Sequence, residues 1–163
     1  MPQGVSGQFG GRQSHGGGDR RTSHQPAPPM SFAEVVFVPA AKLRDEGKVD
    51  LKLYSDIAER AAENVAQDRN KNKPAQLRRF YDELVLLHDK AVREPAKFEG
   101  QRPFIQMLKA KVAYATGRGN VDETFRSLLC RVVDQTVDVE TLGQARLFME
   151  AFMAFYKVYR PRD

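Results

Sequence analysis

Apolar side chains recur at the three- and four-residue spacing of an α-helix through most of the chain. Asp50 is a suitable N-cap for a first helix over residues 51–67. The polar residues 68–73 predict a connector, after which Pro74 suits the first turn of a second helix that Pro95 ends. The expected apolar faces comprise Leu53, Ile57, Ala61 and Val65 in the first helix, and Leu77, Phe80, Tyr81, Leu84, Leu87, His88 and Ala91 in the second.

Three more helices are predicted towards the C-terminus. The third covers 103–116, and the glycines within 117–119 suit a left-handed C-cap. Asn120 and Glu123 have the spacing of a capping box and predict the start of the fourth. The last is predicted over 141–159. The apolar residues of these two final helices include Phe125, Leu128, Leu129, Val132 and Val133, followed by Phe148, Phe152, Phe155, Tyr156 and Tyr159.

An apolar run over 31–41, interrupted by Pro39, fits either an extended arm or a short turn of helix, and its periodicity does not decide between them. No other segment alternates between apolar and polar residues as a strand would. We therefore expect an all-α fold, a compact bundle of about five helices over 30–163. Residues 1–29 are rich in glycine, proline and polar side chains, which predicts a disordered tail.

The formal net charge is +5 at pH 7 and the calculated isoelectric point is near 9.4. This moderate positive charge is compatible with an anionic partner, but many proteins share it, so the positions of the charges must decide. The one cysteine, Cys130, excludes a disulfide framework and a cysteine-rich zinc site. The sequence shows no signal-peptide core and no apolar segment of membrane-spanning length, so we expect a cytoplasmic protein without membrane contact.

Few side chains suit catalysis. His15 and His24 lie in the predicted tail, which leaves His88 and the aspartate after it without the further histidines that a metal phosphohydrolase needs. We interpret His88 as a core or partly buried histidine and Cys130 as a small core residue. The glycines of 117–119 follow a helix rather than a strand and do not fit a phosphate loop. The sequence therefore predicts no enzymatic activity, no metal and no cofactor.

The start of the second helix carries a cluster of cations. Arg78 and Arg79 lie about 100° apart on a helix, so both cannot lie behind one apolar stripe. On a helical wheel Arg79 points outward and Arg78 lies at the margin of the apolar face. Lys71 and Lys73 precede the helix, where free N–H groups and the helix dipole also favour an anion. This arrangement suits phosphate, and Gln76 would add a neutral hydrogen bond.

The third helix is expected to place Lys111 near the middle of a broad apolar face, with Lys109 pointing away and Arg118 at the helix end. A lysine in that position either extends its ammonium to water or meets an anion on another surface. An ordinary solvated face, with cations that complement the helix dipole, is the alternative. The expected apolar face comprises Phe104, Met107, Leu108, Val112, Tyr114 and Ala115.

Three stretches, KPAQLRRFYDEL, PFIQMLKAKVAYATGR and FMEAFMAFYKVY, together resemble the small subunit of the type III-A (Csm) CRISPR effector complex in order, spacing and character. The resemblance covers residues 70–160 and is weak upstream. It implies a compact helical protein without catalytic activity, which functions in antiviral defence and stacks in several copies as a short filament. The implied partners are the guide RNA, the target RNA paired to it, the repeated backbone subunit and the large polymerase-like subunit.

In such a complex, base pairing reads the sequence and the protein contacts RNA backbone, which fits scattered cations. Lys157 lies with Arg146 and Arg160 on the side of the last helix opposite its aromatics, and contacts either RNA or the next subunit. The predicted RNA-binding residues are Lys71, Lys73, Gln76, Arg78, Arg79, Lys109, Lys111, Arg118 and Lys157.

Two other interpretations stay open. A free-standing helix-turn-helix regulator would need one recognition helix with several polar side chains projecting together. A purely protein-binding module would use exposed apolar residues such as Leu86. In either case, replacing Arg78 and Arg79 would leave RNA binding unchanged, or there would be none to lose.

Overall fold

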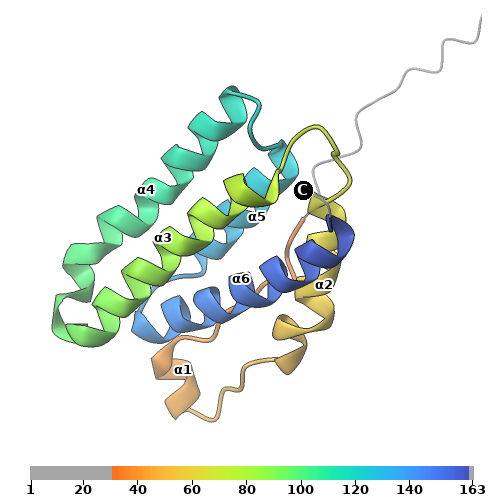
Figure 1. The fold of residues 1–163 in the computed structure, drawn as a ribbon. Coiled ribbons are helices and arrows are strands. Elements are labelled where there is room, and N and C mark those ends of the chain that lie inside the picture. The colour runs from red at the N-terminus through yellow and green to blue at the C-terminus, as the bar shows by residue number, and fades with distance from the viewer. Residues whose placement is uncertain (1–30, 162–163) are drawn as a thin grey trace, which may run out of the picture.

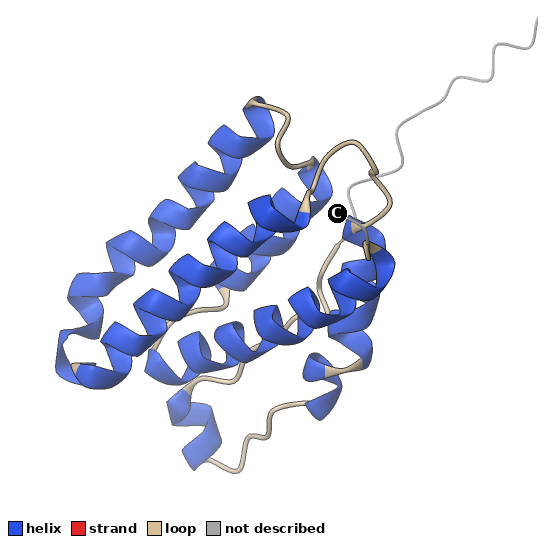
Figure 2. Cartoon of the chain, viewed as in Figure 1, coloured by secondary structure: helices blue, strands red, loops and turns tan. Residues whose placement is uncertain are grey.

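The computed structural model describes residues 31–161, and every regular element in that range is helical (Figures 1 and 2). The predicted all-α fold is confirmed. The predicted tail, 1–29, lies outside the described residues. The α-helices are α1 (Ala40–Arg44), α2 (Asp56–Val65), α3 (Pro74–Arg93), α4 (Phe98–Gly117), α5 (Glu123–Asp134) and α6 (Val139–Tyr159), with 3₁₀ turns at Leu51–Tyr54 and Pro95–Lys97.

Helix α6 is the centre of the bundle, because α2 and α3 both pack along it while α4 packs against α3 and α5 (Figure 1). Its inward face carries Phe148, Phe152 and Tyr156, all fully buried. Aromatic rings continue from α6 to the neighbouring helices. Phe152 lies 5.6 Å from Tyr156 and 6.3 Å from Phe125 of α5, measured between ring centroids. Three residues of the predicted aromatic stripe therefore lie in the core, whereas Phe155 and Tyr159 are half-buried at its edge.

The apolar run over 31–41, whose conformation the periodicity did not decide, is mainly extended, and α1 begins only at Ala40. The Gln144 side chain of α6 explains this conformation, since its amide accepts from the Val38 N–H and donates to the Val38 carbonyl, both at 2.8 Å. Arg131 of α5 also donates to the Val35 carbonyl at 2.9 Å. Side chains of two helices thus satisfy backbone groups that would otherwise need a helix or a sheet.

The predicted boundaries of the first and third helices were wrong. The expected helix over 51–67 is a 3₁₀ turn followed by α2, because Ser55 leaves helical geometry with φ −128° and ψ −99°. Asp50 does cap the first of these pieces, accepting from the Lys52 N–H at 3.0 Å. Helix α4 begins at Phe98 rather than at Pro103. Its first turn buries Phe98, and the ring of Pro103 is accommodated inside the helix at the loss of one backbone hydrogen bond.

The last two helices are capped by aspartates. Asp122, not Asn120, is the N-cap of α5 and accepts from the Phe125 N–H at 2.8 Å. The preceding Val121 is fully buried, so the helix begins two residues later than the predicted capping box placed it. Asp138 forms a capping box with Thr141 at the start of α6. Within 31–161, each helix is too short or too polar to span a bilayer.

Candidate nucleic-acid interface

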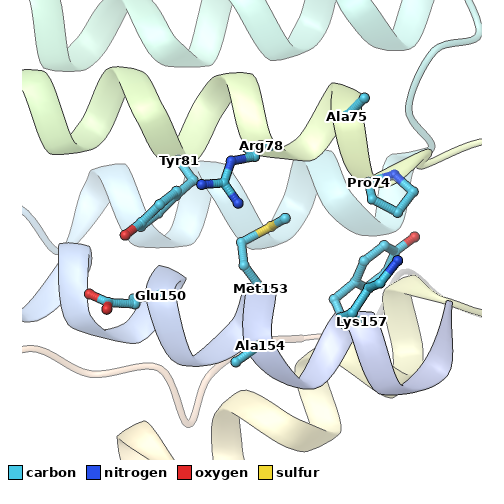
Figure 3. A pocket seen from close by; sticks show the side chains of 9 residues that line it. Pro74, Ala75, Arg78, Tyr81, Glu150, Met153, Ala154 and Lys157 are labelled. Atoms are coloured by element: carbon cyan, nitrogen blue, oxygen red, sulfur yellow. The ribbon is translucent and has the colours of Figure 1, made fainter. Parts of the chain in front are cut away.

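A groove between α3 and α6 brings together cations from both helices (Figure 3). It has a volume of about 590 Å³, and we call it the α3–α6 groove. Arg78 contributes to one wall and Lys157 to the other, and both side chains are exposed. The complete lining is Pro74, Ala75, Arg78 and Tyr81 from α3, with Glu150, Met153, Ala154, Tyr156 and Lys157 from α6.

The groove combines an apolar floor with charged walls. Burial raises the pKa of the Tyr81 hydroxyl, Glu150 adds to the rise, and Arg146 and Arg78 oppose it. Tyr81 therefore stays a neutral hydrogen-bond donor. Arg78 pairs only loosely with Asp82 at 3.8 Å, and both side chains are more than half exposed. Such an exposed pair is easily exchanged for a contact with another anion.

The start of α3 forms one end of this groove. Lys73 is its N-cap residue, and no side chain caps the helix. Pro74 has no N–H, and the N–H groups of Gln76 and Leu77 both donate to the Lys73 carbonyl, at 2.8 and 3.2 Å. The Ala75 N–H is therefore the first-turn donor without an acceptor among the described residues, and Ala75 lines the groove. Lys73 is exposed, whereas Lys71 and Gln76 are half-buried. The start of α3 thus adjoins the groove, and a phosphate site there stays a prediction.

Arg79 is exposed but is not part of the groove lining, so the two adjacent arginines diverge as predicted. Arg118 also lies elsewhere, at the end of α4. Its guanidinium lies 5.7 Å from the centre of the Tyr114 ring and donates to the Tyr114 hydroxyl at 3.0 Å. Gly119, with φ 73°, has the left-handed conformation expected of the C-cap region. The nine predicted residues therefore do not form one track.

The predicted placement of the lysines of α4 was wrong. Lys111 pairs with Glu83 of α3, and Lys109 pairs with Asp134 of α5 at 2.5 Å instead of pointing away. The predicted apolar face was rotated, because α4 packs between two helices along a narrower stripe. That stripe consists of Phe98, Gln101, Ile105, Leu108 and Val112, whereas Phe104, Met107 and Tyr114 are more than half exposed.

The remaining candidates agree with their interpretation from sequence. His88 is half-buried, and its Nδ1 has no hydrogen-bond partner among the described residues. Cys130 is half-buried against the core. Leu86 is exposed. Within 31–161, no group of three or more histidine, cysteine, aspartate or glutamate side chains is arranged to hold a metal ion.

Sequence reasoning missed several groove residues and one buried arginine. Glu150 and Met153 share a helix face with the predicted Lys157, at spacings of three and four, so their position in the groove could have been inferred. Arg160, expected on the polar side, is instead only 3% exposed. Nothing in its local spacing indicates this, because its partners lie in the connector before α3.

The fold is thus that of a small helical-bundle protein with a basic groove between two of its helices. The family model described as Csm2 Type III-A matches residues 48–162. This match covers more than half of the chain, so the chain belongs to the Csm2 family and is a small subunit of the type III-A CRISPR effector complex. The match also includes α2, whereas the resemblance noted from the three sequence stretches began at residue 70. No curated protein and no solved structure matched the chain.

Proposed function

We propose that this small subunit contacts the backbone of the guide RNA–target RNA duplex through the α3–α6 groove. The observation that carries the proposal is the position of Arg78 and Lys157 on opposite walls of one groove, beside the uncapped start of α3. Arginine can hold a phosphate through two parallel hydrogen bonds, lysine adds a point charge, and the Ala75 N–H at the helix start would add one more donor. Lys71 and Lys73 extend this positive surface at the same end of α3.

The other predicted cations take a smaller part in the proposal. Lys109 and Lys111 each lie beside a carboxylate, so their fields are largely neutralised at the distance of an RNA strand. Arg79 and Arg118 lie outside the groove and would contact a second segment of RNA or a second subunit. Gln76 stays a secondary hydrogen-bond donor near the groove.

In the proposed assembly, several copies lie along the duplex in the cytoplasm as part of antiviral defence. Each copy then supplies few phosphate contacts, and repetition along the strand raises the overall affinity. The subunit has no catalytic role in this proposal, and base pairing supplies the sequence specificity.

One further surface favours contact with protein. Leu86 of α3 is 70% exposed, and Phe104, Met107 and Tyr114 of α4 are between 51% and 67% exposed. The Lys111–Glu83 pair and the Lys90 ammonium over the Phe104 ring show that the outer faces of α3 and α4 adjoin. We assign this apolar face to packing against another subunit of the effector complex.

The test is purification of the complex through a tag on this subunit, followed by RNA crosslinking. Arg78→Ala combined with Lys157→Ala should leave the other subunits bound and reduce crosslinking of this subunit to RNA. Lys109→Ala combined with Lys111→Ala removes the same charge and is the matched control, with little expected effect. Equal loss in both variants, or recovery of the chain without guide RNA, would overturn the proposal.

A further inference from the structure

The connector between α2 and α3, residues 66–73, is held by side chains from distant parts of the chain. Asn72 is fully buried and has a left-handed backbone, with φ 56°. Its side chain donates to the Val65 carbonyl at 3.0 Å and accepts from the Asp122 N–H at 2.9 Å. Its own N–H donates to the Asn120 carbonyl at 3.1 Å. Asparagine tolerates this conformation better than most residues do, so Asn72 fixes the connector against the start of α5.

The end of α6 supplies a second set of bonds. Arg160 donates to the carbonyls of Asp68, Arg69 and Lys71 at 2.9, 3.2 and 3.3 Å. The Tyr156 hydroxyl donates to the Asn72 carbonyl at 2.5 Å. Tyr156 and Arg160 lie four residues apart, so both project from the same face of the helix. We call these two side chains, with their acceptors, the connector clamp.

The clamp joins the two walls of the α3–α6 groove. Tyr156 lines the groove, and the next residue is Lys157. On the opposite side, the connector ends at Lys73, and Pro74 begins α3 and also lines the groove. In Figure 1 the end of α6 lies beside the connector that leads into α3. Bonds between α6 and the connector therefore set where the start of α3 lies relative to Lys157.

Burying a guanidinium destabilises the fold unless its N–H groups find acceptors, and those of Arg160 donate to backbone carbonyls of the connector. These hydrogen bonds hold the connector in one conformation. A binding surface that is already ordered loses less entropy when its ligand arrives. Lys71 and Lys73 lie in this connector, so their fixed positions are the feature that would matter for binding.

We propose that Tyr156 and Arg160 are positioning residues, which hold Lys71, Lys73 and the start of α3 in the geometry that binds RNA phosphate. This inference rests on the proposed function of the α3–α6 groove. Neither side chain needs to touch RNA. Their effect passes through the connector and should disappear when the connector cations are absent.

The experiment combines hydrogen exchange and RNA binding on the full chain, well below its melting temperature. Tyr156→Phe removes the hydroxyl that donates to the Asn72 carbonyl. Arg160→Lys keeps the positive charge but cannot bond to all three carbonyls as arginine does. Tyr159→Phe is the matched control, since the Tyr159 hydroxyl donates to Glu59 at 3.2 Å at an exposed site. Exchange at the connector amides should accelerate about tenfold in the first two variants, with little change in the control.

Binding is measured with a guide–target RNA duplex as the probe. Tyr156→Phe and Arg160→Lys should weaken binding by about 3- to 10-fold, while in a Lys71→Ala/Lys73→Ala background the further loss should be less than about 2-fold. A purely structural role predicts equal losses in both backgrounds, which would overturn the inference, as would unchanged connector exchange. Binding that is indifferent to Arg78→Ala and Lys157→Ala would instead overturn the proposed function, and this inference with it.

Discussion

Lys111 of α4 forms an ion pair with Glu83 of α3, so its ammonium lies at the boundary between two helices and not in the middle of an apolar face. The pair is partly exposed, and exposed pairs contribute little to stability. Its larger effect is to mask a positive charge. This relationship separates the cations of α4 from those of the α3–α6 groove.

Replacing Glu83 with glutamine should therefore strengthen RNA binding while changing stability only slightly. The substitution removes one negative charge and releases Lys111, and the expected stability loss is below about 1 kcal/mol. Urea denaturation and RNA titration at several salt concentrations measure the two effects. Glu99→Gln, at a residue paired with Arg102, is the charge-matched control. Weaker RNA binding in Glu83→Gln would show that the ion pair itself supports the interface.

Two phenylalanines should respond very differently to truncation. Phe152 is fully buried between aromatic rings, so Phe152→Ala should lower the free energy of unfolding by about 3–5 kcal/mol. Phe104 is 59% exposed, and Phe104→Ala should lower it by less than about 1 kcal/mol. Chemical denaturation of both variants checks the rotated packing face of α4. A large loss of stability in Phe104→Ala would mean that Phe104 packs in the core, as the sequence led us to expect.

Asp138 should make stability depend on pH in the acid range. Burial acts to raise the pKa of its carboxyl, but hydrogen bonds from Thr141 and Ala40, with the charge of Arg44, lower it below its usual value. Because the folded-state pKa is depressed, this stabilisation is fully present above the unfolded pKa of about 3.9 and is lost as pH falls through the lower folded-state value.

The measurement is urea denaturation of the wild type and Asp138→Asn at neutral pH and near pH 3. Asparagine keeps an N-cap oxygen but does not titrate. The variant should be less stable at neutral pH and should lose less stability on acidification. Asp89→Asn controls for the removal of a surface charge, and an identical pH dependence in wild type and Asp138→Asn would contradict the prediction.

Cys130 should react slowly with alkylating reagents. Burial raises the pKa of its thiol, an effect that Lys109 and Arg126 partly oppose. Less thiolate is then present at neutral pH, so iodoacetamide should modify the native chain at least about tenfold more slowly than the urea-unfolded chain. The chain has one cysteine, so mass spectrometry follows a single modification. Equal rates in the two states would mean that the thiol is not protected by the fold.

The sequence by itself determined the helical class, the approximate order of the helices and the family. These features depend on local periodicity and on the order of short motifs, and both can be read from residues that are neighbours in the sequence. The outward direction of Arg79 and the core position of Phe148 and Phe152 follow from helical spacing in the same way. Helix ends were less certain, because Phe98 and Val121 are fixed by burial against other helices.

Only the tertiary structure decided which cations are available and which are engaged. Lys109 and Lys111 meet carboxylates of other helices, and Arg160 meets the carbonyls of a connector far from it in sequence. The distance in sequence between each cation and its partner follows no regular spacing, so no local pattern reveals the contact. Whether a charged side chain faces water, an acid or a carbonyl depends on which helices lie side by side, and that follows from how the whole core packs.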